Sequence, residues 1–246
     1  MMYLPIMNRI ELSIRIVVAF FLLGGLPADS VADEEEVSTA APLIEDLGNE
    51  RYRIGTITVD KTARTFSLSG KILHLSEPLE YLAVRTGGDK GYESLLELET
   101  SAVEFQLACI LVGLDDEKNV KPRFQYDELE VEGQAVEITI SWEADGVRKT
   151  TSAANAMIAG DEPVLDDGWI YVGSQPSPED GSLLAEVSGT LIGFVHDPFS
   201  IIEHRNGVTA GSYGMITGNV ELLPPEGSSI TLTVSVVTDQ GEMETR

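Results

Sequence analysis

Residues 91–113 read GYESLLELETSAVEFQLACILVG, and we expect the rest of the chain to be organised around this stretch. Its first part, Glu93–Leu98, predicts a short strand. Ser101 and, three residues later, Glu104 form the pattern of a capping box, which marks the start of a helix. Gly113 is a residue at which such a helix commonly stops. Nearly every position between is apolar, so we expect a helix over residues 102–112 that other elements bury on all sides.

Outside this stretch, apolar and polar residues mostly alternate, which is typical of strands. The clearest example is Val136–Trp142, and the Asp145-Gly146 pair that follows it predicts a tight hairpin turn. Runs of this kind recur to the end of the chain, among them Leu183–Ser188 and Thr190–Val195, which we expect to be two strands, and the sequence has no internal repeat. We therefore predict a β-dominated α+β fold in which about ten short, mostly antiparallel strands surround the helix 102–112.

The chain divides into four parts. Residues 1–32 are expected to be a signal peptide, and residues 33–50 a flexible acidic linker. Residues 51–240 form a single domain, and residues 241–246 are a polar tail. A domain of this length can bury a core large enough to fold without disulfides or metals.

The expected signal peptide has the usual three regions. Arg9 and Arg15 provide positive charge, residues 16–26 provide an apolar run, and small residues precede a cleavage site after Ala32. The apolar run is shorter than the roughly 20 residues that cross a bilayer, which favours a signal over a membrane anchor. We expect an exported protein, periplasmic or secreted, with no stable membrane insertion after cleavage. Met7 is an alternative start to Met1.

Charge limits the partners of the protein. The chain has 16 Lys and Arg against 41 Asp and Glu, a net charge of −25. Nucleic acids and anionic membranes are therefore excluded as expected partners, because both are bound through basic patches. An acidic surface that keeps the protein soluble explains this charge most simply, and attraction for cations or a basic partner is the alternative.

Cys109 is the only cysteine of the chain. One thiol cannot form a disulfide pair, an iron–sulfur cluster, a cysteine-type zinc site or a CxxC redox motif. Because Cys109 lies within the apolar helix and no His is near it in the sequence, we interpret it as a small buried hydrophobic residue rather than a nucleophile.

Two groups of polar residues are candidates for a site. Tyr92, Glu93 and Ser94 follow a glycine-rich loop, where the Glu can act as a general base or contact a ligand, or can simply satisfy backbone donors of residues 86–91. The second group is a possible ligand set for a divalent cation, with scattered surface polarity as the alternative reading. Its members are His196, Asp197, Glu203 and His204.

Acidic loops are a further candidate for calcium. Asp115-Asp116-Glu117 and Asp166-Asp167 supply the oxygen ligands that Ca²⁺ prefers. The sequence contains no GxSxG, HExxH, Walker, GxGxxG or CxxC motif, so no common catalytic pattern is present. No resident cofactor is expected beyond Ca²⁺ or another divalent cation.

Several motifs, spread from about Ile54 to Val237, together resemble the YdjY-domain family of exported bacterial proteins, often found in Planctomycetes. They are Ile57-Thr58-Val59-Asp60-Lys61, Leu79-Glu80-Tyr81-Leu82-Ala83, Gly91-Tyr92-Glu93-Ser94-Leu95-Leu96, Trp169-Ile170-Tyr171-Val172-Gly173-Ser174, Asp197-Pro198 and Leu223-Pro224-Pro225. Tyr92 stands where the family usually has a His before the Glu-Ser pair. The resemblance implies a fold and an exported location, and no mechanism.

Three functions remain open from the sequence. The lack of a catalytic motif favours a non-catalytic domain that binds a small molecule or a protein partner. The first alternative is an enzyme or redox-accessory protein that uses Glu93 with His196 or His204, which requires these side chains to meet in one cleft. The second alternative is a domain that depends on a divalent cation.

Overall fold

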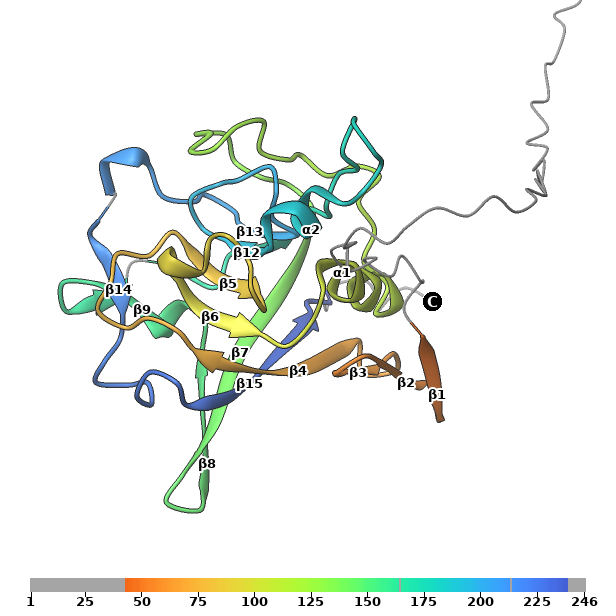
Figure 1. Ribbon diagram of the computed structural model, residues 1–246, viewed down its shortest axis with the longest axis horizontal. Helices are drawn as coiled ribbons and strands as arrows, with labels where there is room; N and C mark the ends of the chain where they lie inside the picture. Colours follow the sequence, from red (N-terminus) through yellow and green to blue (C-terminus); the bar gives the residue numbers. More distant parts are fainter. Residues whose placement is uncertain (1–42, 164, 213, 239–246) are drawn as a thin grey trace, which may run out of the picture. The chain divides into compact units, whose positions relative to one another are not determined.

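Figure 1 shows a computed structural model of the protein, which describes residues 43–163, 165–212 and 214–238. The predicted signal peptide, residues 33–42 of the predicted linker and the predicted tail lie outside these ranges. The described chain has the helices α1 (Ala102–Leu111) and α2 (Leu184–Ser188). Its strands are β1 (Ile44–Gly48), β2 (Arg51–Ile54), β3 (Ile57–Asp60), β4 (Thr65–Ile72), β5 (Tyr81–Arg85), β6 (Ser94–Leu98), β7 (Gln134–Ala144), β8 (Val147–Ser152), β9 (Met157–Ala159), β10 (Glu162–Pro163), β11 (Trp169–Tyr171), β12 (Thr190–Gly193), β13 (Ile202–His204), β14 (Ile216–Gly218) and β15 (Ser229–Val236).

Eight of the described strands pair in a closed ring. The order is β4-β15-β7-β11-β13-β12-β5-β6, and β6 pairs back to β4. The pairs β5–β6 and β12–β13 are parallel, and the other pairs of the ring are antiparallel. A ring of this size encloses an interior that side chains fill, and it has no free sheet edge. The predicted β-dominated α+β class is confirmed, and its architecture is a closed barrel.

The remaining strands extend or flank the barrel. The strands β1, β2 and β3 continue the sheet beyond β4, and β8 pairs with β7 as a hairpin. The strands β10, β9 and β14 form a separate three-stranded sheet. These flanking strands explain why the described chain has more strands than the sequence predicted.

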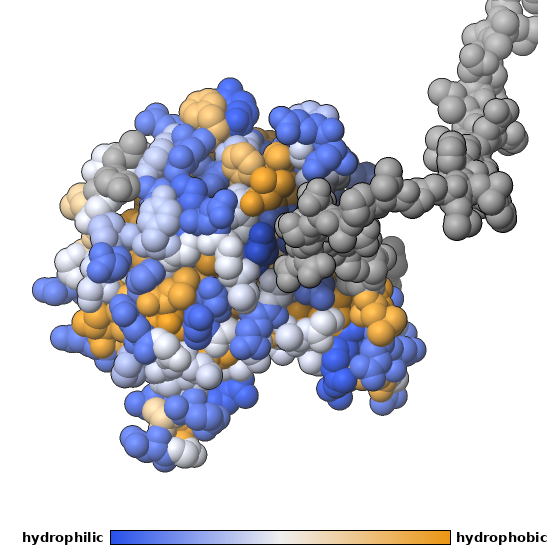
Figure 2. All heavy atoms as spheres, in the orientation of Figure 1, coloured by the Kyte–Doolittle hydropathy of each residue, from blue (hydrophilic) through white to orange (hydrophobic). Residues whose placement is uncertain are grey.

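Hydrophilic residues cover most of the face drawn in Figure 2, where apolar residues gather in a few separate groups.

The alternation read from the sequence places the core inside the barrel. Leu68, Leu232 and Ile140 are register partners on β4, β15 and β7, and all three are buried. Their neighbours Ser67, Thr233 and Thr139 are also register partners, and these are only partly buried. Because successive side chains of a strand point to opposite faces, one face of this sheet supplies the core and the other meets solvent.

The helix α1 is not buried on all sides, so that prediction is wrong. Ala102, Phe105 and Cys109 are fully buried, and the Phe105 ring meets the Phe66 ring edge to face with centroids 5.3 Å apart. Val103 and Ile110 on the other side are 37% and 51% exposed. The barrel closes without α1, so the helix has elements to pack against on one side only. Burial raises the pKa of the Cys109 thiol, as expected for an inert side chain.

The N-terminus of α1 is capped twice. The predicted capping box is present, with the Glu104 N–H donating to Ser101 Oγ at 3.2 Å and the Ser101 N–H donating to Glu104 Oε2 at 3.0 Å. In addition, Oε2 of Glu186 accepts the N–H groups of Ala102 and Val103 at 2.7 and 3.3 Å. Because Glu186 lies on α2, this cap also fixes α2 against the start of α1.

Two segments differ from the sequence-based expectation. Residues 183–188 were expected to form a strand, but Leu184–Ser188 is the helix α2, which ends at Gly189 with φ of 81°. A short apolar run does not distinguish a strand from one helical turn by its periodicity. Residues 44–48 fall within the expected flexible linker but form β1, which pairs with β2. Regular structure therefore begins before Arg51.

Candidate functional site

One residue from each predicted group, Ser94 and Glu203, lies in a single row across the barrel. Ser94 on β6 is the register partner of Tyr81 on β5, Tyr81 pairs with Gly193 on β12, and Gly193 pairs with Glu203 on β13. A Cβ atom at Gly193 would lie 2.7 Å from Ser200 Oγ and 2.9 Å from Glu203 Oε1. The missing side chain at Gly193 therefore leaves the space into which Glu203 reaches.

Tyr81 lies at the centre of this row. It has no exposed surface, and its phenol donates a hydrogen bond of 2.6 Å to Oδ2 of Asp197. The Nζ atom of Lys90 lies 5.8 Å from the centroid of the Tyr81 ring, within cation–π distance. Burial, followed by the charge of Asp197, raises the pKa of Tyr81, so the phenol keeps its proton and acts as a donor.

Glu93 is paired with an ammonium group. It is 7% exposed, and its Oε1 accepts a hydrogen bond of 2.7 Å from Lys90 Nζ. Burial lowers the pKa of Lys90, but the hydrogen bond and the charge of Glu93 outweigh burial and raise it overall. Ser94 Oγ donates to the Lys90 carbonyl at 2.7 Å, whereas Tyr92 is 64% exposed. The partner of Glu93 is thus the Lys90 side chain rather than the backbone of the glycine-rich loop.

Glu80 is a second buried carboxyl group next to Glu93. It is 4% exposed and accepts hydrogen bonds from the Tyr126 phenol and, at 3.0 Å, from Gln125 Nε2. Burial raises the pKa of Glu80, the Tyr126 hydrogen bond opposes this effect, and the charge of Glu93 adds to it. Neither Glu80 nor Lys90 was predicted from the sequence as a site residue. A charged residue within the apolar run Leu79–Val84 was the available signal for Glu80.

Asp197 and Glu203 lie side by side on the other side of Tyr81. The Asp197 N–H donates to Glu203 Oε1 at 2.9 Å, and the Phe199 N–H donates to Asp197 Oδ1 at 3.0 Å. Glu203 is fully buried, and its Oε2 has no hydrogen-bond partner among the described residues. The same holds for the buried Ser200 Oγ. Burial raises the pKa of Glu203 well above its ordinary value.

The two histidines are held elsewhere. The ring nitrogens of His196 lie 2.6 Å from the Asp127 carbonyl oxygen and 2.7 Å from the His204 carbonyl oxygen. The Nε2 atom of His204 lies 2.9 Å from Oδ1 of Asp166, and burial lowers the pKa of His204. Neither imidazole forms a hydrogen bond with Glu93 in the part of the chain that the structure describes.

The four residues predicted as metal ligands therefore separate into two pairs. Glu203 and His204 are consecutive on β13, so their side chains point to opposite faces of the strand. Asp197 and Glu203 are in contact, while the two imidazoles have other partners. Within residues 43–163, 165–212 and 214–238, no group of three or more His, Cys, Asp or Glu is arranged to hold a metal ion.

A pocket of about 420 Å³ lies over this cluster. Its polar lining includes Lys90, Gln125 and Asp197, each of which bonds to a residue of the cluster described above. Its apolar lining comes from three segments, the 122–127 loop, α2 and the loop after β12. These residues are Phe124, Val187, Pro198 and Phe199. Apolar walls over a few polar groups are typical of small-molecule sites.

The loop that carries Phe124 and Gln125 is fixed at both ends. Arg123 and Asp127 form a two-point ion pair, with Nε–Oδ2 and Nη2–Oδ1 distances of 2.7 and 2.9 Å. The hydrogen bond with Arg123 lowers the pKa of Asp127. The Tyr126 N–H donates to the carbonyl oxygens of Val195 and His196 at 3.1 and 3.0 Å. This wall of the pocket is therefore preformed.

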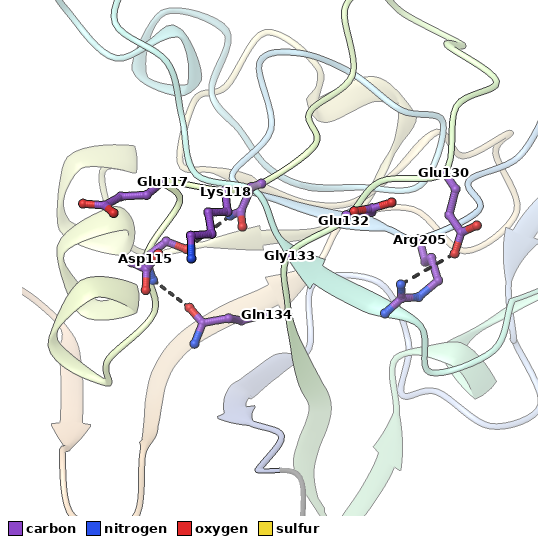
Figure 3. A pocket seen from close by; sticks show the side chains of 9 residues that line it. Asp115, Glu117, Lys118, Glu130, Glu132, Gly133, Gln134 and Arg205 are labelled. Atoms are coloured by element: carbon purple, nitrogen blue, oxygen red, sulfur yellow. Dashed lines mark hydrogen bonds and ion pairs between the residues drawn. The ribbon is translucent and has the colours of Figure 1, made fainter.

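A second pocket of about 620 Å³ is lined by charged residues (Figure 3). It includes Asp115 and Glu117 of the predicted calcium loop, whereas Asp116 pairs with Lys121 at 2.6 Å. The carboxylates labelled in Figure 3 do not converge on one point, and Arg205 lies 3.6 Å from Glu130. The arrangement resembles a polar surface hollow more than a cation cage, because Ca²⁺ sites gather six to eight oxygens around one ion.

Comparisons with known proteins identify one family. The family model of the YdjY domain matches residues 57–235, which include the whole row from Ser94 to Glu203. No curated protein and no solved structure gave a significant match. Among the described helices, none is both long enough and apolar enough to cross a membrane.

Proposed function

The chain belongs to the YdjY domain family, and on that premise we propose that it is an exported binding domain. Its ligand occupies the pocket lined by Lys90 and Asp197 and is held there without chemical change. The N-terminal residues 1–32, with their positive end, apolar run and small residues before the expected cleavage site, support export to the periplasm or beyond.

The single observation behind this proposal is that the polar groups beneath the pocket bind one another. The Tyr81 phenol is bonded to Asp197, the Lys90 ammonium to Glu93, and the Glu80 carboxyl group to Tyr126. Each of these three groups thus already has a partner that holds it in place. A preformed polar floor with apolar walls favours recognition, because little side-chain ordering remains to oppose binding.

The described contacts give less support to the two alternatives. An enzyme that uses Glu93 needs an accompanying base, but His196 and His204 are bonded to backbone carbonyls and to Asp166. Ser94 donates its hydroxyl hydrogen to a carbonyl oxygen rather than to a base. If the protein depends on Ca²⁺, the best candidate site is the charged pocket that includes Asp115. Measuring the melting temperature at increasing Ca²⁺ concentration tests this directly.

A ligand screen by thermal shift tests the proposal. The purified protein is melted with a broad library of amines, acids, sugars and peptides, and compounds that raise the melting temperature are kept. Each of these compounds is then titrated into the Val187→Trp variant. Val187 lines the pocket and is 57% exposed, so the larger Trp side chain fills the pocket. Val220→Trp is the matched control, because Val220 is 55% exposed and does not line the pocket.

We expect ligands that bind the wild type and Val220→Trp but not Val187→Trp, and that are recovered unchanged after incubation. Ligands that bind Val187→Trp as well as the wild type would contradict the assignment of the pocket. Conversion of a pocket ligand to a product by the wild type would contradict the non-catalytic role.

A further inference from the structure

The groups around the pocket have an excess of acceptors and negative charge. Glu80, Glu93 and Asp197 are 4%, 7% and 4% exposed, and Asp89 lines the pocket as a fourth carboxylate. Lys90 is the only basic residue in the pocket lining, and its ammonium is already bonded to Glu93. We propose, building on the function above, that the ligand carries an ammonium or guanidinium group on an apolar stem.

The hydrogen-bond donors to Asp197 and Glu80 are all neutral groups. Asp197 receives its hydrogen bonds from the Tyr81 phenol and the Phe199 N–H, which are neutral donors. The donors to Glu80, on Tyr126 and Gln125, are neutral as well. Neutral donors satisfy the lone pairs of Asp197, which lines the pocket, but they do not compensate the charge of a carboxylate, and at low dielectric this charge attracts a cation strongly.

Glu203 lies behind Asp197 and is fully buried, and its Oε2 atom has no hydrogen-bond partner among the described residues. Burial raises its pKa and so favours the protonated, neutral form. Glu203 therefore supplies no positive charge to the cluster. An ammonium brings three donors and no acceptor, and a guanidinium brings five. An anionic ligand would bring further acceptors and would meet four carboxyl groups around a single Lys90.

The apolar wall fits the stem of such a ligand. Phe124 and Val187 are 56% and 57% exposed, and they line the pocket together with Phe199. Methylene groups that cover these side chains remove apolar surface from water. The Phe124 ring already accommodates one cation, because the Arg123 guanidinium carbon lies 5.4 Å from its centroid. Alkyl amines and the side chains of Lys and Arg have this combination of stem and charge.

Three probes of equal length distinguish the contribution of the charged group to binding from that of the apolar stem. Hexylammonium, hexanol and hexanoate are titrated into the purified protein by calorimetry at low salt. We expect hexylammonium to bind about tenfold more tightly than hexanol, because the pocket supplies uncompensated negative charge, and hexanoate to bind most weakly. The advantage of hexylammonium should shrink at high salt.

Two variants test the residues that carry the inference. Asp197→Asn should reduce the preference for hexylammonium over hexanol, whereas Asp161→Asn, an exposed residue outside the pocket lining, should leave it unchanged. Lys90→Gln removes the competing ammonium, so it should bind hexylammonium more tightly than the wild type does. This second variant gives an answer even if Asp197→Asn does not fold.

Binding of hexanoate as tight as that of hexylammonium would overturn the ligand class and leave the pocket in place as a binding site. Weaker binding of hexylammonium to Lys90→Gln would also overturn it. If none of the three probes binds, the ligand class is again wrong, and the thermal-shift screen with Val187→Trp then decides the proposed function separately.

Discussion

The phenol of Tyr81 donates a hydrogen bond of 2.6 Å to the carboxylate of Asp197, which lies 116 positions later in the chain. This contact joins β5 to the loop after β12 directly beneath the pocket. Tyr81 is fully buried, so the loss of its hydroxyl group leaves one oxygen of Asp197 without its donor.

Replacement of this hydroxyl group gives the first prediction. Tyr81→Phe should lower the free energy of unfolding by about 1–3 kcal/mol, the usual cost of a buried polar group that loses its partner. Urea denaturation measures the change. Tyr92→Phe is the control, because Tyr92 is 64% exposed, so the contact of its hydroxyl group with Lys90 is open to solvent and its loss should cost no more than about 0.5 kcal/mol. Equal stabilities of Tyr81→Phe and the wild type would show that the hydrogen bond does not stabilise the fold.

The buried Glu203 gives a pH dependence. Burial raises its pKa in the folded protein, so the folded state holds the proton more firmly than the unfolded chain does. The resulting stability is fully present below the ordinary Glu value of 4.5 and is lost as the pH rises through the raised value. Glutamine cannot lose a proton, and its Oε1 can still accept the Asp197 N–H.

Glu203→Gln should therefore melt at a higher temperature than the wild type at roughly pH 8, and the difference should shrink toward acidic pH. Melting curves of both proteins across this range measure it. A wild type that gains stability over Glu203→Gln as the pH rises would contradict the direction of the pKa change.

The two faces of α1 should respond differently to substitution. Phe105→Ala removes a fully buried ring that packs on Phe66 and should cost about 3–5 kcal/mol of folding free energy. Ile110→Ser changes a side chain that is 51% exposed and should stay within about 0.5 kcal/mol of the wild type. Chemical denaturation measures both. A large loss for Ile110→Ser would indicate that another element or a partner covers this face.

Local features of the fold were predictable because their causes lie within a few residues. The capping box of Ser101 and Glu104 forms as its spacing predicts. The Asp145-Gly146 pair adopts positive φ angles of 53° and 74° between β7 and β8, as a two-residue hairpin turn requires. The strand Val136–Trp142 lies within β7.

The closure of the barrel was not predictable from local patterns. It depends on the pairing of β4 with β6 and on the parallel pairing of β12 with β13, and neither pairing leaves a signal in either strand alone. The exposed side of α1 has the same cause, since an apolar sequence does not tell how many neighbours a helix has. The helix was therefore expected at the centre of the strands.

The sequence predicted part of the candidate site. Glu93, Ser94, Asp197 and Glu203 were singled out, and the structure places them in one cluster. Tyr81, the residue that connects them, was missed because an aromatic residue in an apolar strand is usually part of the core. The histidines were included because they are close in sequence to Asp197 and Glu203, but strand alternation and backbone bonds direct their rings elsewhere.

A crystal structure of the protein with the tightest ligand from the thermal-shift screen would locate the binding site directly. We expect the ligand to lie between Phe124 and Phe199, with a positively charged group within roughly 3 Å of Asp197. A ligand bound elsewhere, such as in the charged hollow of Figure 3, with the pocket over Tyr81 left unoccupied, would contradict this expectation.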